Sequence, residues 1–141
     1  MSKRESIASN LVSTLQAVTQ IKKVTREPFD FQKLSNAQFP AVLIQTASES
    51  RSDITIGDSN ITREGSIDYL IVGYTKGTSI DTARNQLVEY IEEALDVDRT
   101  RGGHALDTQI VSVETDEGSI DPIGGVLVTV RVLYNFTRGA T

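Results

Sequence analysis

The sequence contains no cysteine and no tryptophan, and only one of its 141 residues is a histidine. Without cysteine, the chain forms no disulfide, no thiolate metal site and no cysteine nucleophile. No apolar run approaches the roughly 18 residues that a membrane-spanning helix needs, so we expect no membrane span. The first ten residues, MSKRESIASN, are charged and have no apolar core, so we also expect no export signal.

The composition, with 38% hydrophobic and 23% charged residues, is that of a globular protein, and the length fits one domain over residues 1–141. The net charge is −5 and is unevenly distributed. Residues 1–40 hold six basic and three acidic side chains, a net +3, which leaves −8 for the remainder. An acidic body does not neutralise phosphates over a broad surface, so we expect DNA to pass it without binding. For the basic segment around Lys22, Lys23 and Arg26, we favour a protein contact or a solvated edge.

A helix is predicted to begin at Ser2, because Ser2 and Glu5 have the spacing of a capping box, and to end near Thr19. Its apolar residues recur every three or four positions and form one stripe: Ile7, Leu11, Leu15 and Val18. A weak strand over 21–26 follows. The loop over 27–40 contains three of the four phenylalanines, so we expect it to pack against the body of the protein.

Residues 41–46 are apolar and predict a largely buried strand. The polar segment 47–62 is interpreted as a long hairpin with a turn at 57–60. Residues 66–75 predict a central strand, because both of its faces carry large apolar side chains and look covered. One face holds Ile67, Tyr69 and Ile71, and the other holds Leu70, Val72 and Tyr74.

A second helix is predicted after Gly77, with Thr78 or Ser79 as its cap and Asp81 in its first turn. Strands over 108–114 and 126–136 follow, and we expect them to pair through the loop 115–125. The predicted fold is therefore a single α+β domain. It has a mainly antiparallel or mixed β-sheet of about five to six strands, two helices packed on one face, and a protruding hairpin. The connection from the second helix to the next strand would account for a parallel pair in a mixed sheet.

The segment from Ile91 to Gly118 contains a dense polar turn and is where an active site would be sought first. A metal site needs three or more converging ligands, whereas Asp96, Asp98 and His104 are loosely spaced and no second histidine exists. Basic side chains and glycines are also what a helix C-terminus uses to satisfy its carbonyls and its negative dipole. We therefore predict a helix end here rather than a metal or catalytic centre.

Other kinds of site fit no better. Gly102 and Gly103 lie beside arginines, but a phosphate-binding loop leads into a helix, whereas this loop leaves one. The acidic residues at 114–121 lack the spacing of a helix-loop-helix calcium site. The sequence has no Gly-x-Ser-x-Gly elbow, dinucleotide-binding glycine pattern or phosphate-loop lysine. We expect no catalytic residue, no metal and no cofactor.

A small acidic domain with charged protruding segments and no catalytic set is typical of an assembly subunit. The charged turn and the predicted hairpin then become candidate interface elements. The candidate contacts to a neighbouring subunit, tube or connector are Arg51, Asp53, Asp98, Arg99, Arg101, His104, Asp116 and Glu117.

Four runs carry a family resemblance: KKVTREP at 22–28, LSNAQFPAVLIQ at 34–45, EEALDVDRTRGGHALDTQIVSVETDEG at 92–118 and VRVLYNFTRG at 130–139. In their order along the chain and in their residues, these runs resemble the tail terminator proteins of tailed bacteriophages, which are also called tail completion or minor tail proteins of the neck. The resemblance spans most of the chain. It implies a sheet flanked by helices with a protruding hairpin.

The resemblance also implies a non-enzymatic structural protein of the virion, in the tail or neck, assembled in the host cytoplasm. Such proteins form a hexameric ring on the finished tail tube and stop its polymerisation. Their partners are the tail tube protein, the head–tail connector or neck proteins, and a sheath where one is present. DNA passes through the lumen without specific binding.

Two alternatives stay open. One is a head–tail adaptor or another ring protein of the neck, and the other is a small metal-dependent hydrolase centred on His104. For the ring, we expect a double charge reversal, Arg99→Glu with Arg101→Glu, to leave the subunit folded and to weaken assembly.

Overall fold

The structure, a computed structural model, describes residues 2–53, 62–116 and 122–137. Within these residues, two α-helices and five strands follow one another, with two short 3-10 turns between β1 and β2 at Phe31–Lys33 and Asn36–Gln38. The elements are α1 (Lys3–Gln16), β1 (Lys23–Thr25), β2 (Ala41–Asp53), β3 (Thr62–Lys76), α2 (Ile80–Asp96), β4 (Asp107–Thr115) and β5 (Ile123–Thr137).

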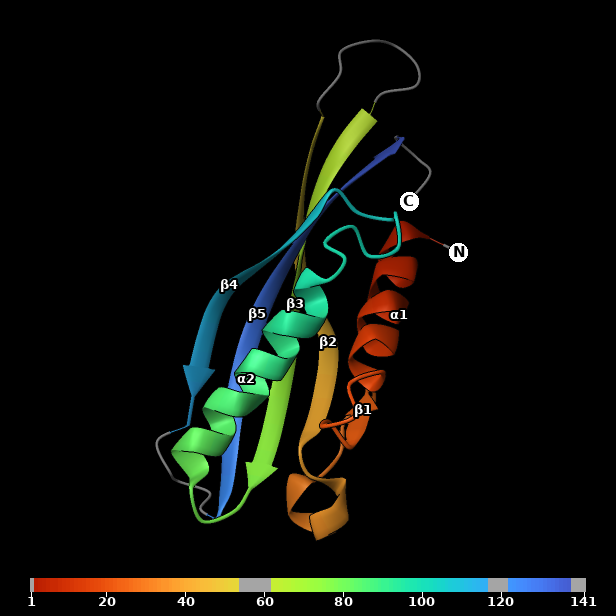
Figure 1. Cartoon of the computed structure of the whole chain (residues 1–141). Coiled ribbons are helices and arrows are strands. Elements are labelled where there is room, and N and C mark those ends of the chain that lie inside the picture. The colour runs from red at the N-terminus through yellow and green to blue at the C-terminus, as the bar shows by residue number, and fades with distance from the viewer. Residues whose placement is uncertain (1, 54–61, 117–121, 138–141) are drawn as a thin grey trace.

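The five strands form one mixed sheet in the order β1-β2-β3-β5-β4, and both helices lie on one face of it (Figure 1). This confirms the predicted α+β class. The β1–β2 pair is parallel and every other pair is antiparallel. The connection through α2 therefore produces no parallel pair, because β5 inserts between β3 and β4.

The first helix begins where the sequence predicts and ends at Gln16, three residues before the predicted end. The Ser2 hydroxyl oxygen accepts a hydrogen bond from the Glu5 backbone N–H at 3.2 Å. The Glu5 carboxylate pairs instead with Arg26, which joins α1 to the segment after β1. Ile7, Leu11 and Leu15 are completely buried, as their spacing predicts.

The predicted hairpin is confirmed as the shared end of two long strands. β2 and β3 stay paired from Ala41↔Tyr74 to Asp53↔Arg63, with a bulge between Thr46 and Glu49. Both strands extend beyond the helices at the top of Figure 1. The turn predicted at 57–60 lies outside the described residues.

The central position of β3 is confirmed, but its predicted coverage on both faces is wrong. Ile67, Tyr69 and Ile71 are completely buried beneath the helices, whereas Leu70 and Val72 on the opposite face are only half-buried. The reason is that both helices pack on the same side of the sheet. The opposite side is therefore an open face.

The loop over 27–40 packs against the body of the protein, as its phenylalanines predict. The Phe31 ring stacks on the Tyr74 ring with centroids 4.7 Å apart, and the Phe29 ring meets Tyr74 edge-on at 5.9 Å. Phe39 is buried. The loop thereby covers the lower end of the open face.

The second half of the chain also follows the sequence prediction. Ser79 is the N-cap residue of α2, although its side chain makes no capping hydrogen bond. β4 and β5 form an antiparallel pair from Asp107↔Leu133 to Thr115↔Val126. The inward-facing residues of β5 alternate as expected and complete the core under the helices: Val126, Val128, Val130, Val132, Tyr134 and Phe136.

Candidate functional site

The polar turn between α2 and β4 is built around a buried arginine. Arg101 has no exposed surface, and its backbone is in the left-handed region at φ 50°. Its guanidinium donates hydrogen bonds to the carbonyl oxygen of Leu95, in the last turn of α2, and to that of Asp98, two residues after α2 ends. Burial lowers the pKa of Arg101 below its ordinary value. The side chain thus satisfies a helix carbonyl and balances the negative end of the helix dipole.

Asp98 holds the same turn from outside. Its Oδ1 accepts hydrogen bonds from the Thr100 hydroxyl at 2.6 Å and from the Thr100 backbone N–H at 2.9 Å. Its Oδ2 accepts from the Gly102 N–H at 2.9 Å. These bonds, the Thr100 hydroxyl first, lower the pKa of Asp98 to about 2. The carboxylate is therefore committed to local backbone geometry.

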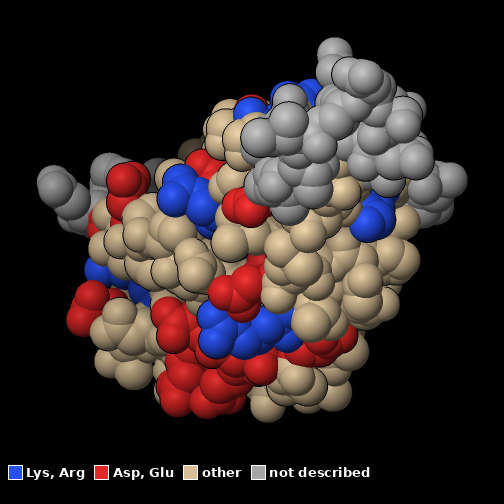
Figure 2. Space-filling view, turned by 90° about the horizontal axis from the view of Figure 1, so that it is seen from above, with Lys and Arg blue, Asp and Glu red and all other residues tan. Residues whose placement is uncertain are grey.

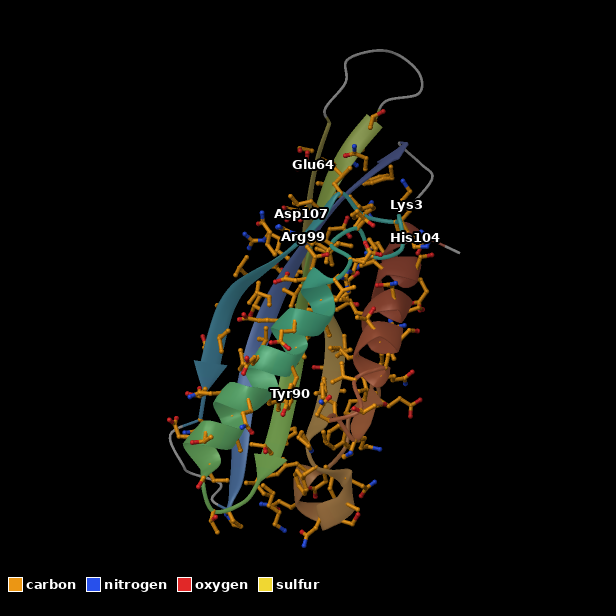
Figure 3. All side chains as sticks on the ribbon, in the orientation of Figure 1. Lys3, Glu64, Tyr90, Arg99, His104 and Asp107 are labelled. Carbon is orange, nitrogen blue, oxygen red and sulfur yellow. The ribbon has the colours of Figure 1, made fainter. Side chains whose placement is uncertain are left out.

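The turn is tied to β4 on one side and lies close to α1 on the other. The Arg99 Nε is 2.7 Å from Asp107 Oδ1, and the Thr108 hydroxyl donates to the Arg99 carbonyl at 2.8 Å. Figure 3 shows Arg99 and Asp107 together at the start of β4, with His104 nearer the start of α1. His104 is exposed. These contacts fix the turn as part of the scaffold.

The residues considered for a metal site do not come together. Among residues 2–53, 62–116 and 122–137, no group of three or more His, Cys, Asp or Glu side chains is placed to hold a metal ion. In the acidic segment after β4, Asp116 Oδ1 lies 2.8 Å from Arg84 Nη1 and accepts from the Gly125 N–H at 2.7 Å. Asp116 therefore joins β4, β5 and α2. Glu117 lies outside the described residues.

A second polar cluster, at the base of the hairpin, was missed by the sequence analysis. The Glu49 side chain is only 8% exposed, and its carboxylate pairs with Arg4, 2.7 Å away at Nε, and with Arg51. The Tyr134 hydroxyl donates to Glu49 at 2.8 Å. Burial and the hydrogen bond to Glu49 raise the pKa of Tyr134 to about 12. The inward alternation of β5 could have indicated Tyr134, but the bulge that turns Glu49 inward leaves no sequence signal.

The predicted contact residues therefore separate into three groups. Five of them have partners within their own chain: Arg51, Asp98, Arg99, Arg101 and Asp116. Arg101 has no surface to offer a neighbour, so its predicted role as a contact is corrected to that of a helix cap. His104 is exposed, while the Asp53 side chain and Glu117 lie outside the described part of the structure.

The accessible features of this region lie along α2 and β4. A groove of about 480 Å³ runs between them, lined by Glu92, Asp96, Arg99, Thr108, Gln109, Ile110 and Val111. Val111 and Val113 on β4 are each 41% exposed. Figure 2 looks down on the end of the molecule that lies at the top of Figure 1. It shows basic and acidic side chains interspersed, with Asp and Glu gathered along one side. Within the described residues, no helix has the length and hydropathy to cross a membrane.

Comparisons with known proteins give little beyond this geometry. No protein-family model matches the sequence, and no curated protein matches it. One similar solved chain belongs to a structure described as "Virion of native gene transfer agent (GTA) particle". The similarity covers 96% of this chain and 92% of that chain, with a TM-score of 0.45 and 9% identical residues. Similarity at this level assigns neither a family nor a function.

Proposed function

We propose that this chain is a structural protein of a phage virion that caps the tail tube as a hexameric ring. In this role it ends tube polymerisation, joins the tail to the head connector, and lets DNA pass through the lumen. The proposal rests on the resemblance of the four sequence runs to tail terminator proteins. The proposed role is non-enzymatic and belongs to the tail or neck of the virion.

The observation that carries the proposal is the agreement between the implied architecture and the fold. The resemblance implies a sheet with flanking helices and a protruding hairpin. Here α1 and α2 cover one face of the sheet, and β2 and β3 continue past them (Figure 1). A projecting hairpin and an uncovered sheet face are surfaces that a monomer does not need for its own core, whereas a ring subunit uses such surfaces to meet neighbours.

The chemistry of the polar turn is consistent with that role. Asp98 and Arg101 are held by hydrogen bonds that cap α2, and Arg99 pairs with Asp107. A catalytic carboxylate needs free lone pairs and a pKa near the working pH, whereas the pKa of Asp98 is lowered to about 2. These observations favour a scaffold over a hydrolase centred on His104.

Native mass spectrometry of the full chain tests the proposal. We expect a closed homo-oligomer, with six copies as the main species. The hydrolase alternative instead predicts stoichiometric bound metal that a His104→Ala variant loses. A chain that stays monomeric at high concentration and does not associate with tail tubes would contradict the ring.

The head–tail adaptor alternative differs in its partner rather than in its shape. A ring that binds purified connectors but leaves tube ends uncapped would favour the adaptor. Mixing the protein separately with tubes and with connectors, followed by co-sedimentation, distinguishes these two roles.

A further inference from the structure

A groove between the two helices is lined mainly by apolar side chains. It has a volume of about 340 Å³ and lies between residues 17–20, at the end of α1, and the second half of α2. Tyr90, Ala94 and Val97 line it from α2, and Val18 lines it from the other side. Figure 3 shows Tyr90 on the side of α2 that faces α1. Val97 is 87% exposed, the highest value among the large hydrophobic side chains of the described residues.

The α2 rim of this groove carries three glutamates, which we call the glutamate ridge. Glu93 lines the groove itself, and Glu89 and Glu92 lie beside it on the exposed side of the helix. Within residues 2–53, 62–116 and 122–137, none of these three side chains takes part in an ion pair or a hydrogen bond. The groove therefore combines an apolar floor with an acidic flank whose charges are not balanced by the described part of the chain.

The glutamate ridge is unfavourable for α2 itself. Glu89 and Glu93 are four residues apart and face each other along the helix, where like charges are destabilising. The last turn of α2 contains Asp96 and no basic residue, although the negative end of a helix dipole favours cations. The buried Arg101 opposes that dipole but leaves the exposed side acidic. Because local rules are broken without a gain inside the chain, we interpret the ridge as a binding surface for cations of a partner.

The walls of the groove determine the kind of segment that fits. The backbone groups of α2 are hydrogen-bonded within the helix, and the N–H groups of Ala17 and Val18 donate to carbonyls of α1. An extended segment laid in the groove would therefore find no strand edge to pair with. An α-helix satisfies its own backbone and binds through side chains, as in other apolar grooves that recognise amphipathic helices. Its apolar stripe fits the floor, and basic residues beside that stripe fit the ridge.

The two described helices of this chain are not available as occupants, because each buries its apolar stripe on its own sheet. The occupant is therefore a helix of a different protein. We propose that the groove between α1 and α2 binds a basic, amphipathic α-helix of a partner protein. The apolar stripe of that helix packs on Tyr90, Ala94 and Val97, and its lysines or arginines pair with the glutamate ridge. The proposal goes beyond the tail-tube ring and does not depend on it.

Binding of a synthetic helix to the full chain tests the proposal. The probe is a fluorescein-labelled peptide of about 18 residues, long enough to form a helix, made of leucine, alanine and lysine with the leucines on one stripe. A scrambled peptide of the same composition keeps the charge but loses the stripe. By fluorescence anisotropy, the amphipathic peptide should bind about tenfold more tightly than the scrambled one, because only it can bury its leucines in the groove. Equal affinities, or no binding of either peptide, would overturn the proposal.

Two substitutions locate the peptide in the groove, and each has a matched control on β4. Val97→Ser removes an exposed apolar side chain from the groove and should weaken binding about fivefold, whereas Val113→Ser should leave binding unchanged. Glu93→Gln removes one charge from the ridge and should weaken binding about threefold at low salt, whereas Glu114→Gln should have no effect. Equal effects of either substitution and its control would overturn the proposed site.

The melting temperature separates a binding role of Glu93 from a structural one. Because Glu93 is repelled by the other acidic side chains of α2, Glu93→Gln should preserve or raise the melting temperature while it weakens peptide binding. A lower melting temperature would show that Glu93 stabilises the fold and would overturn its assignment to the ridge.

Native mass spectrometry with the peptide present separates this proposal from the proposed ring. A ring that does not bind the peptide would overturn the groove proposal and leave the proposed function in place. A chain that binds the peptide in the groove but stays monomeric would support the groove and contradict the ring.

Discussion

At the scale of single residues, the charged side chains of the α2–β4 turn support the chain's own structure. Arg101 is buried, and its guanidinium donates to one carbonyl in the last turn of α2 and to one in the turn that follows. The Asp98 carboxylate accepts three hydrogen bonds from the same turn. The double charge reversal expected from the sequence is consequently a poor test of assembly. Arg101→Glu would place a carboxylate against the C-terminal carbonyls of α2 and disrupt the fold itself.

The helix-capping role of Arg101 predicts a large loss of stability on truncation. We expect Arg101→Ala to lower the free energy of unfolding by about 3 kcal/mol, because charged hydrogen bonds and buried packing are lost together. Arg99→Ala is the matched control. It removes an exposed ion pair with Asp107 and should cost less than about 1 kcal/mol. Urea denaturation of the three proteins measures both values, and equal effects would contradict the assignment.

Asp98 predicts a specific acid sensitivity. Its folded-state pKa is lowered from 3.8 to about 2, so its stabilising contribution is present above the ordinary value. That contribution is lost as the pH falls from the ordinary pKa of Asp98 through its folded-state pKa. The melting temperature of an Asp98→Asn variant should therefore fall less over this pH range than that of the natural protein. Calorimetry across the acid range checks this, and parallel curves for the two proteins would count against the hydrogen-bonded carboxylate.

The sequence predicted part of this residue-scale picture. Basic residues and glycines after a helix indicated a capped helix end, and the Arg101 side chain provides that cap. The sequence could not show which arginine is buried. Arg99 and Arg101 have the same chemistry, and only the left-handed backbone at Arg101 turns its side chain inward.

At the scale of elements, the base of the β2–β3 hairpin depends on a close approach between strands. Tyr134 is buried over Gly65, which lies beside it on β3. A Cβ atom built on Gly65 would be 2.8 Å from the Tyr134 Cζ and 2.9 Å from a Glu49 carboxylate oxygen. Any side chain at this position therefore displaces the ring and the polar cluster beneath the start of α1.

Gly65→Ala should lower the free energy of unfolding by about 2 kcal/mol, as expected for overpacking at a buried site. Ser66→Ala, one residue along on the open face, should stay within about 0.5 kcal/mol of the natural protein. The clash also predicts coupling. Gly65→Ala combined with Tyr134→Ala should cost less than the sum of the single changes, and strict additivity in this double-mutant cycle would contradict the account.

Hydrophobic periodicity predicts the buried residues of some elements correctly and fails for others. The alternation of β5 and three of the four residues in the predicted α1 stripe are buried as predicted, because each element has one covered face, whereas Val18 lies after the end of α1 and is only partly buried. For β3 the prediction is wrong, because Leu70, Val72 and Tyr74 have the apolar character of core residues but lie on the open face. Whether a second layer covers them depends on where distant helices pack, which the local pattern of a strand does not encode.

At the scale of the whole molecule, the described residues form a sheet with one face covered by the helices and one open face, and a hairpin that projects beyond the helices. The acidic side of α2 and the basic β1 segment lie at opposite sides of the sheet. This polarity is what a head-to-tail ring requires, since each subunit must present two different surfaces.

The most direct test of the central claim is electron microscopy of tail tubes assembled with and without the purified protein. The account predicts a ring at one end of each tube, and tubes that stop growing when the protein is added to polymerising subunits. Tubes that grow equally long with the protein present, with bare ends, would contradict the proposed capping function.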